Sequence, residues 1–137
     1  MILEYFANFC DSGVCLNERH RCKYPIIKQA PLEEMYPTPI DVNWIVKKCK
    51  IELEAHDKFH VYYPRTAKWN GRFYIAGKEI YKFEIPCDSN MKYIDLEFLN
   101  LDILRYIAQD ANISCELYID DDVVCPYNLS LLIEVEN

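Results

Sequence analysis

The sequence of 137 residues lacks long hydrophobic runs, and we expect its first residues not to act as a secretory signal. No run approaches the ~18 apolar residues that a membrane-spanning helix requires. The first residues, 1–8, carry no basic group ahead of an apolar segment, and Glu4 and Asn8 interrupt their hydrophobic side chains, which is not typical of a secretory signal. We therefore expect no membrane association and a cytoplasmic location, in the host cytoplasm if a phage encodes the protein.

Common catalytic motifs are also missing. The three glycines form no phosphate loop, dinucleotide fingerprint or G-x-S-x-G elbow, and no cysteine has an evident Cys/His/Asn setting. His56 and His60 have the i, i+4 spacing of a helical metal site, but no glutamate follows His56 as in zinc metalloproteases. We expect a protein that is not an enzyme.

Positive charge is scarce in the C-terminal third. Residues 1–87 contain 13 Lys/Arg and 11 Asp/Glu, whereas residues 88–137 contain 2 and 11, and the whole chain has a net charge of −7. This charge opposes direct binding to a nucleic acid. A C-terminal third this acidic indicates a solvated surface, or one that presents carboxylates to a basic partner.

What the sequence does contain favours a folded protein. Its residues are 51% hydrophobic and 14% aromatic, far from the composition of disordered chains. The length fits one domain over residues 1–137. We predict the α+β class, with a mainly antiparallel sheet of about five or six strands, one principal helix at about residues 100–111, and an irregular Cys/Pro-rich segment over residues 10–40. At most one helical turn, over residues 32–36, is expected inside that segment.

Alternation of apolar and polar residues predicts the strands. They are expected at residues 2–9, 48–55, 59–63, 81–85, 113–119 and 129–135. Between residues 42 and 49 the alternation changes parity, which leaves either a bulge at Lys47-Lys48 or a short helix capped by Asp41, with the extended alternative preferred. Asn70-Gly71 lies between the aromatic, β-prone segments 62–69 and 72–75 and predicts a type I′ hairpin turn. Gly77 predicts a bulge or bend before the strand continues to Pro86.

A change to helical spacing predicts the one helix. Asn100 is its expected N-cap, and Asp102 lies near the positive end of the helix dipole. The apolar residues at three- and four-residue spacing are Leu101, Leu104, Ile107, Ala108 and Ala111.

Four residues near the N-terminus are candidate zinc ligands. Cys10, Cys15, His20 and Cys22 form the pattern C-x4-C-x4-H-x-C, whose thiolates and imidazole suit a tetrahedral structural zinc ion. The pattern lacks the tight cysteine knuckle of most zinc sites, and seven scattered cysteines also fit reduced or buried thiols. We expect no cofactor, with a structural zinc as the alternative.

The acidic third supplies the expected partner-binding residues. Asp120-Asp121-Asp122 lacks the glycine and the distal glutamate of a calcium loop and fits a solvated turn better. The set consists of six carboxylates and two tyrosine anchors: Asp102, Asp110, Glu116, Asp120, Asp121, Asp122, Tyr106 and Tyr118.

These residues lead to two hypotheses about function. The first is a small acidic, non-enzymatic binding protein that inhibits a partner by covering a basic surface, either nucleic-acid-binding or catalytic. Toxin-immunity proteins and phage anti-defence proteins such as anti-CRISPRs act in this way, so the expected partner is a protein with a basic surface, for example a nucleic-acid-processing effector. The alternative is a zinc-stabilised accessory or regulatory domain built on the four N-terminal candidate ligands.

Overall fold

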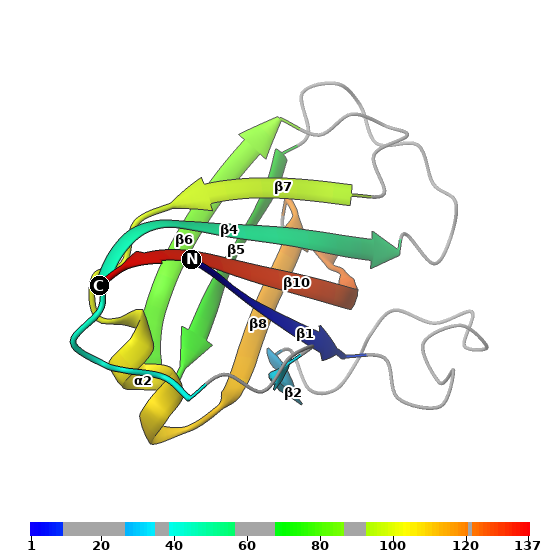
Figure 1. Cartoon of the computed structure of the whole chain (residues 1–137). Coiled ribbons are helices and arrows are strands. Elements are labelled where there is room, and N and C mark those ends of the chain that lie inside the picture. Colours follow the sequence, from blue (N-terminus) through cyan, green and yellow to red (C-terminus); the bar gives the residue numbers. More distant parts are fainter. Residues whose placement is uncertain (10–26, 35–38, 57–67, 87–92, 121) are drawn as a thin grey trace.

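The chain forms two antiparallel β-sheets (Figure 1). A computed structural model describes residues 1–9, 27–34, 39–56, 68–86, 93–120 and 122–137, with the backbone alone at residues 56, 122, 123 and 125. Sheet A has the strand order β3-β1-β10-β4-β7, and sheet B has the order β2-β8-β5-β6, with β9 paired to β8. The bounds in sheet A are β1 Ile2–Asn8, β3 Glu33–Glu34, β4 Ile45–His56, β7 Tyr93–Phe98 and β10 Cys125–Glu136. Those in sheet B are β2 Ile27–Pro31, β5 Lys68–Ile75, β6 Lys78–Pro86, β8 Asn112–Ile119 and β9 Asp122–Val123.

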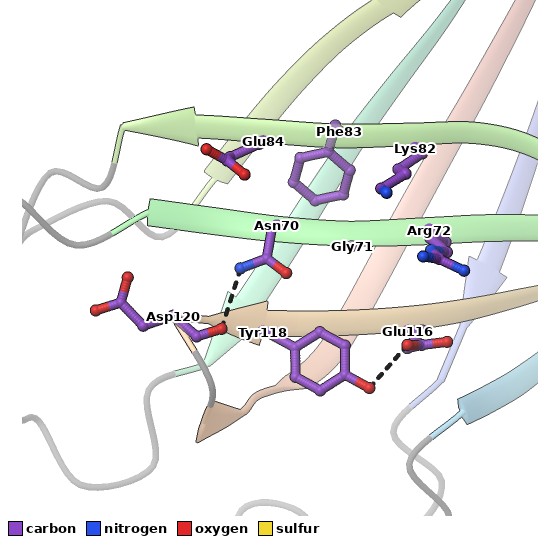
Figure 2. Close-up of a pocket in the computed structure, with 9 residues that line it drawn as sticks. All are labelled: Asn70, Gly71, Arg72, Lys82, Phe83, Glu84, Glu116, Tyr118 and Asp120. Carbon is purple, nitrogen blue, oxygen red and sulfur yellow. Dashed lines mark hydrogen bonds between the residues drawn. The ribbon is translucent and has the colours of Figure 1, made fainter.

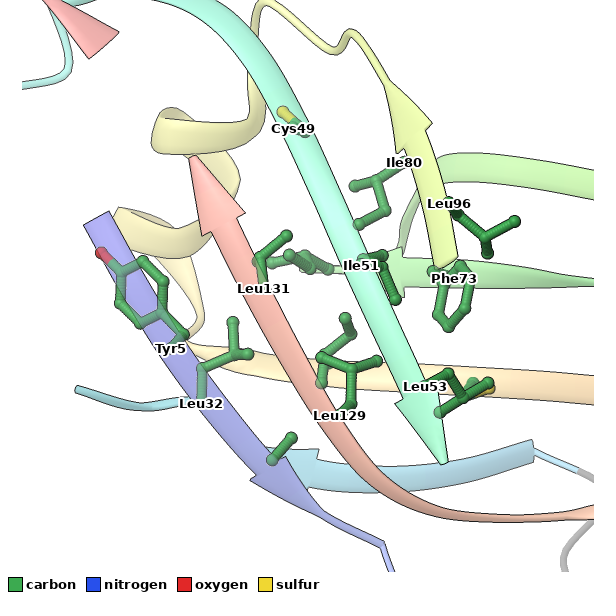
Figure 3. Close-up of a cluster of buried hydrophobic side chains, with 14 of the residues drawn as sticks. Tyr5, Leu32, Cys49, Ile51, Leu53, Phe73, Ile80, Leu96, Leu129 and Leu131 are labelled. Carbon is green, nitrogen blue, oxygen red and sulfur yellow. The ribbon is translucent and has the colours of Figure 1, made fainter. Parts of the chain in front are cut away.

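The two sheets face each other across a shared hydrophobic core. Along β4 the side chains of Cys49, Ile51 and Leu53 are fully buried, and the residues between them point outward. Sheet B contributes large inner side chains such as Trp69 and Phe73. Figure 3 shows the side chains of both sheets in this layer, and Figure 1 shows that the strands of one sheet cross those of the other obliquely. Period-two alternation in both sheets therefore places one apolar face of each against the other.

Two polar atoms in this core stand without a partner. The hydroxyl of Tyr5 and the indole Nε1 of Trp69 are buried and have no hydrogen bond within the part of the chain that the structure describes. Burial raises the pKa of Tyr5 to about 12, and the negative charge of Glu34 adds to that rise. The charged phenolate is thus strongly disfavoured at this position.

The sheets are connected at both lateral edges. On one side, the segment from β2 to β3 leaves sheet B and joins sheet A, and the Leu32 amide at the crossing donates to the carbonyl of Ala111 at 2.8 Å. On the other side, the ring of Tyr81 in β6 stacks on that of Phe98 in β7 at a centroid distance of 4.6 Å. Offset stacking at this distance adds to the burial energy of the two rings.

The predicted single sheet is wrong, because the structure has two sheets. Three strand segments were missed: β7, the two-residue β9, and the β2–β3 segment, which replaces the irregular chain and the start of the helical turn expected at residues 32–36. In β7, Ile94 and Leu96 are buried and alternate with exposed Asp95 and Glu97. This pattern is short, and the helical spacing of the residues that follow obscured it. The predicted strand at residues 59–63 lies outside the described residues, and the single-domain organisation stays a prediction.

The helix is shorter than predicted. Helix α2 spans Ile103–Gln109, with Asp102 as its N-cap residue. Asn100 instead forms a turn before the helix, its side-chain oxygen accepting a hydrogen bond from the Asp102 amide at 3.0 Å. At the other end the backbone of Asp110 is already extended. The buried residues are Ile103, Leu104 and Ile107, while Leu101, Ala108 and Ala111 are exposed, so only part of the predicted apolar stripe faces the core.

The predicted hairpin turn at Asn70-Gly71 is also wrong. Both residues lie within β5, and the β5–β6 hairpin turns at Ala76-Gly77, whose φ angles are 53° and 73°. Positive φ at both central residues is the geometry of a type I′ turn. Gly71 has a different reason to be glycine, because a Cβ there would collide with the carbonyl oxygen of Glu116 on the neighbouring strand.

The predicted bulge near Lys47-Lys48 is confirmed. Glu134 pairs with Lys48 and the next residue, Val135, pairs with Val46, so Lys47 is the extra residue in β4. The bulge explains how Val46 and Cys49 can both be buried although they are three positions apart. Asp41 caps no helix; its carboxylate accepts from the Asn43 amide at 2.9 Å in a turn that leads into the strand.

Among the described residues, no helix is long and apolar enough to cross a membrane.

Candidate binding faces

The outer side of sheet B is hollowed over β6, β5 and β8. The hollow has a volume of about 550 Å³, and Figure 2 shows the side chains around it. Two cross-strand rows form its walls. They are Lys82, Arg72 and Glu116 in one row, and Glu84, Asn70 and Tyr118 in the other. Gly71 and Phe83 lie between the rows, and Asp120 lies at one end of the hollow.

Three of the predicted partner-binding residues meet here: Glu116, Tyr118 and Asp120. They come from β8 and the residue that follows it, where alternation directs positions 116 and 118 outward. The Tyr118 hydroxyl donates to Oε1 of Glu116 at 2.8 Å. Partial burial raises the pKa of Tyr118 to about 12, and the hydrogen bond to Glu116 contributes to the rise.

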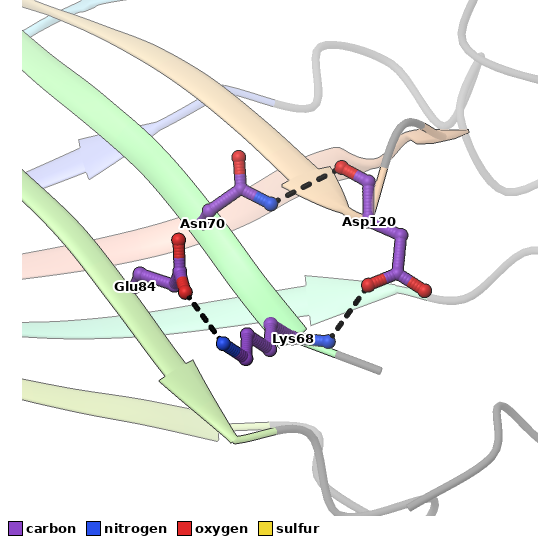
Figure 4. A network of polar contacts seen from close by, with 4 residues as sticks. All are labelled: Lys68, Asn70, Glu84 and Asp120. Atoms are coloured by element: carbon purple, nitrogen blue, oxygen red, sulfur yellow. Dashed lines mark hydrogen bonds and ion pairs between the residues drawn. The ribbon is translucent and has the colours of Figure 1, made fainter. Parts of the chain in front are cut away.

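A polar network fixes the end of the hollow near Asp120 (Figure 4). The backbone amide of Lys68 donates to the Asp120 carboxylate at 3.0 Å, and the Asn70 side chain donates to the Asp120 carbonyl at 3.1 Å. The Lys68 ammonium pairs with Glu84 at 2.9 Å. Asp120 has a φ of 51°, a left-handed conformation that aspartate tolerates better than most residues, and these hydrogen bonds hold it there.

The charges around this hollow nearly cancel. We call this surface the mixed-charge face. It carries three cationic side chains, Lys68, Arg72 and Lys82, and four carboxylates, Glu79, Glu84, Glu116 and Asp120. The predicted residues on β8 therefore do not form a purely negative surface.

The remaining predicted residues lie elsewhere. Asp102, Tyr106 and Asp110 belong to α2 and its two ends, where Asp102 is 4.0 Å from Arg105 and Asp110 accepts from Asn112 at 2.6 Å. Strand β8 leads away from the helix for eight residues, which separates Asp110 from Asp120 by roughly 25 Å at a rise of about 3.3 Å per residue. Asp121 and the side chain of Asp122 are outside the described part.

The strongest concentration of negative charge lies on the outer side of sheet A, where sequence reasoning did not place it. We call this surface the acidic face. Alternation and strand pairing put eight carboxylates and three lysines on it, a net charge of −5. The carboxylates are Glu4, Glu33, Glu52, Glu54, Asp95, Glu97, Glu134 and Glu136, and the lysines are Lys47, Lys48 and Lys50.

The lysines of the acidic face are held among carboxylates. Lys50 pairs with Glu52 at 3.1 Å, and Lys48 pairs with Glu97 at 3.3 Å. The hydrogen bond and charge of Glu52, with the charge of Asp95, raise the pKa of Lys50 above its usual value. Lys47 pairs with Glu136 at 3.2 Å. All three lysines are thus paired with carboxylates, and the excess carboxylates determine the sign of this surface.

The acidic face also exposes apolar side chains. Ile2, Ile45 and Leu99 are 65%, 53% and 58% exposed, at the end of sheet A where β1 and β4 begin and β7 ends. At the opposite end Tyr93 is 63% exposed beside a shallow hollow of about 300 Å³, whose lining includes Phe6 and Glu54. Large apolar groups among charged ones are typical of surfaces that other proteins cover.

Pairing register is the signal that reasoning from sequence lacked. Glu52 and Glu54 alternate outward along β4, and Asp95 pairs directly with Glu52. In the sequence Asp95 lies more than 40 residues from Glu52 and Glu54, in a segment of different overall charge. Only the pairing of β4 with β7 and β10 brings them into one surface.

The candidate zinc ligands Cys10, Cys15, His20 and Cys22 lie outside the described residues, so the zinc site stays a prediction. The same holds for His60. Within the described part, no group of three or more His, Cys, Asp or Glu side chains is arranged to hold a metal ion. Two cysteine side chains are described, those of Cys49 and Cys115, and both are buried free thiols whose pKa is raised by burial.

Comparison with protein-family models, curated proteins and solved structures finds no match to this chain.

Proposed function

We propose that the protein is a non-enzymatic binding protein whose acidic face covers a basic surface on a partner protein and thereby inhibits it. The partner we infer is a cytoplasmic protein with a nucleic-acid-binding or catalytic surface rich in Lys and Arg. Toxin-immunity and phage anti-defence proteins are the functional analogues. The observation that carries the proposal is the net charge of −5 on one side of sheet A.

Two further features of the acidic face support a protein partner. Its exposed apolar side chains provide hydrophobic contacts, and they include Tyr93, a residue type enriched among those that carry most of the energy in protein interfaces. Its carboxylates attract a basic partner over several ångströms and accelerate association. A backbone paired into a sheet also presents both kinds of group in a fixed arrangement, which lowers the ordering cost of binding.

The test is affinity capture from a lysate of the source organism with three forms of the protein. The first is the wild type. The second carries Glu33→Lys, Glu52→Lys and Asp95→Lys on the acidic face. The matched control carries Glu84→Lys, Glu116→Lys and Asp120→Lys on the mixed-charge face. All three forms are first compared by thermal unfolding, so that a loss of binding is read only for folded variants.

We expect the wild type and the control to retain a basic protein that the acidic-face variant does not retain. With the purified partner, the association rate should fall as salt rises, because screening weakens the attraction between exposed charges. The wild type should also block nucleic-acid binding or turnover by that partner. The proposal fails if the acidic-face variant binds as well as the wild type, or if the bound partner keeps its full activity.

A further inference from the structure

The mixed-charge face contains two like charges in an unfavourable position. Arg72 of β5 and Lys82 of β6 are direct cross-strand partners, and both side chains are exposed on the outer side of sheet B. Like charges directly opposite each other destabilise an antiparallel pair. This arrangement is unexpected in a chain with a net charge of −7 and ample carboxylates to separate the two cations.

Each carboxylate that lines the hollow makes a contact within the fold. Glu84 pairs with Lys68 at 2.9 Å, and Glu116 accepts the Tyr118 hydroxyl at 2.8 Å. The third carboxylate on the hollow, that of Asp120, accepts the Lys68 amide. Glu116 is also the cross-strand neighbour of Arg72 on the side away from Lys82.

The two cations keep donors to spare. Arg72 makes one long ion pair, from Nε to Glu79 at 3.5 Å, and a hydrogen bond to Tyr74. A guanidinium has five N–H donors, so several remain. Lys82 has no ion pair with any residue that the structure describes. Figure 2 shows both side chains at the same end of the hollow.

We propose that this hollow binds a small organic phosphate that carries a planar ring. The phosphate lies between Arg72 and Lys82, where a guanidinium fork and an ammonium are the usual donors to such a group. The planar ring of the ligand stacks on the ring of Tyr118. The side-chain amide of Asn70 lies next to Tyr118 in the same cross-strand row. A volume of about 550 Å³ is in the range of small-molecule sites. The proposal is independent of the partner-binding function of sheet A.

Three probes separate the two halves of the site: adenosine 5′-monophosphate, adenosine, and inorganic phosphate. Their binding is measured by calorimetry and by NMR chemical-shift changes. We expect the nucleotide to bind most tightly and to shift the amides of Arg72, Lys82 and Tyr118. Adenosine lacks the phosphate and inorganic phosphate lacks the ring, so each should bind at least about tenfold more weakly.

Four variants assign the contacts. Lys82→Gln should weaken nucleotide binding about tenfold, since a hydrogen bond to a charged group is lost. Lys48→Gln on the acidic face is the matched control and should leave the affinity unchanged. Tyr118→Leu should weaken the binding of the nucleotide but not that of inorganic phosphate. Tyr118→Phe retains the aromatic ring and should retain the affinity for the nucleotide.

Thermal unfolding of Lys82→Gln provides a second readout. Removing one of two opposed cations should leave the melting temperature unchanged or raise it, while nucleotide binding is weakened. A lysine that merely stabilises the sheet would show the opposite, a lower melting temperature and no effect on affinity. No nucleotide binding at millimolar concentration, or equal affinity in Lys82→Gln and Lys48→Gln, would overturn the proposal.

Discussion

Replacing Gly71 by alanine is expected to destabilise the protein by about 2 kcal/mol. Gly71 lies inside β5, between β6 and β8. A Cβ at this position would collide with the Glu116 carbonyl oxygen and would lie 3.0 Å from Cε1 of Phe83. The first obstacle is backbone that is hydrogen-bonded into the sheet, so it cannot move aside as a flexible side chain could.

The magnitude follows from two opposing effects. Inserting a methyl group into a packed region costs about 1–3 kcal/mol, and a backbone obstacle places this site near the upper end. Alanine also restricts the unfolded chain more than glycine does, which returns about 0.4–1 kcal/mol. For a chain of this length, a loss of about 2 kcal/mol corresponds to a decrease of roughly 6–10 °C in the melting temperature.

Gly77→Ala is the matched comparison. Gly77 has a φ of 73° in the β5–β6 turn, and a Cβ there would meet no atom within 4 Å. Its only cost is the left-handed conformation, about 1–2 kcal/mol, reduced by the same unfolded-state effect. Gly71→Ala should therefore be the more destabilising of the two substitutions.

Urea unfolding followed by tryptophan fluorescence is a suitable assay, because Trp69 is buried two residues from Gly71. Both variants are compared with the wild type at equal m-value, so that a change in midpoint reports stability. The reasoning is refuted if Gly71→Ala lies within 0.5 kcal/mol of the wild type. It is also refuted if Gly77→Ala is the more destabilising substitution.

Other outcomes follow from the same structure. Ala76→Asn should raise the free energy of unfolding by about 1 kcal/mol, because Ala76 has a φ of 53° in the type I′ turn and asparagine tolerates that conformation. Thermal unfolding measures this change, and a loss of stability would contradict it. Tyr5→Phe should cost nothing or stabilise, because it removes a buried hydroxyl without a partner in the described chain; a loss above 1 kcal/mol in urea unfolding would show that the hydroxyl is bonded. Folding raises the pKa values of Tyr5 and Tyr118 from the ordinary tyrosine value of 10.0 to about 12. Their contribution to stability is therefore complete below pH 10 and is lost as the pH rises toward 12. Unfolding measured across that range should show the loss, with a smaller loss in Tyr5→Phe. The buried thiols of Cys49 and Cys115 should react with a thiol reagent only as fast as the protein opens, and reaction at the rate of a free thiol would contradict their burial.

The sequence predicted individual strands better than their arrangement. β1, β4, β8 and β10 overlap the expected segments, because alternation of apolar and polar residues is a local property of one strand. The bulge at Lys47 was visible for the same reason, as a change of parity within one segment. The hairpin was misplaced because glycine serves two purposes that look alike in sequence: positive φ at Gly77, and close approach of a neighbouring strand at Gly71.

In the candidate sites too, residues on one strand were predicted, whereas their neighbours on other strands were not. Glu116, Tyr118 and Asp120 were predicted as binding residues, and they do line one hollow. The cations Arg72 and Lys82 that share the hollow were not foreseen, since they come from strands whose pairing with β8 is not written in the local sequence. The C-terminal charge imbalance was real as a count but did not become one surface.

By itself the sequence determined the β-rich character of the protein, the inner and outer residues of most strands, and an excess of carboxylates over basic groups. These depend on composition and on a period of two residues, which each segment carries on its own. Only the tertiary structure decided that there are two sheets, that the opposed cations lie over one hollow, and that the densest negative surface combines Glu33, Glu52 and Asp95 from distant segments. Strand order and register depend on contacts between residues far apart in the chain, and no local pattern specifies them.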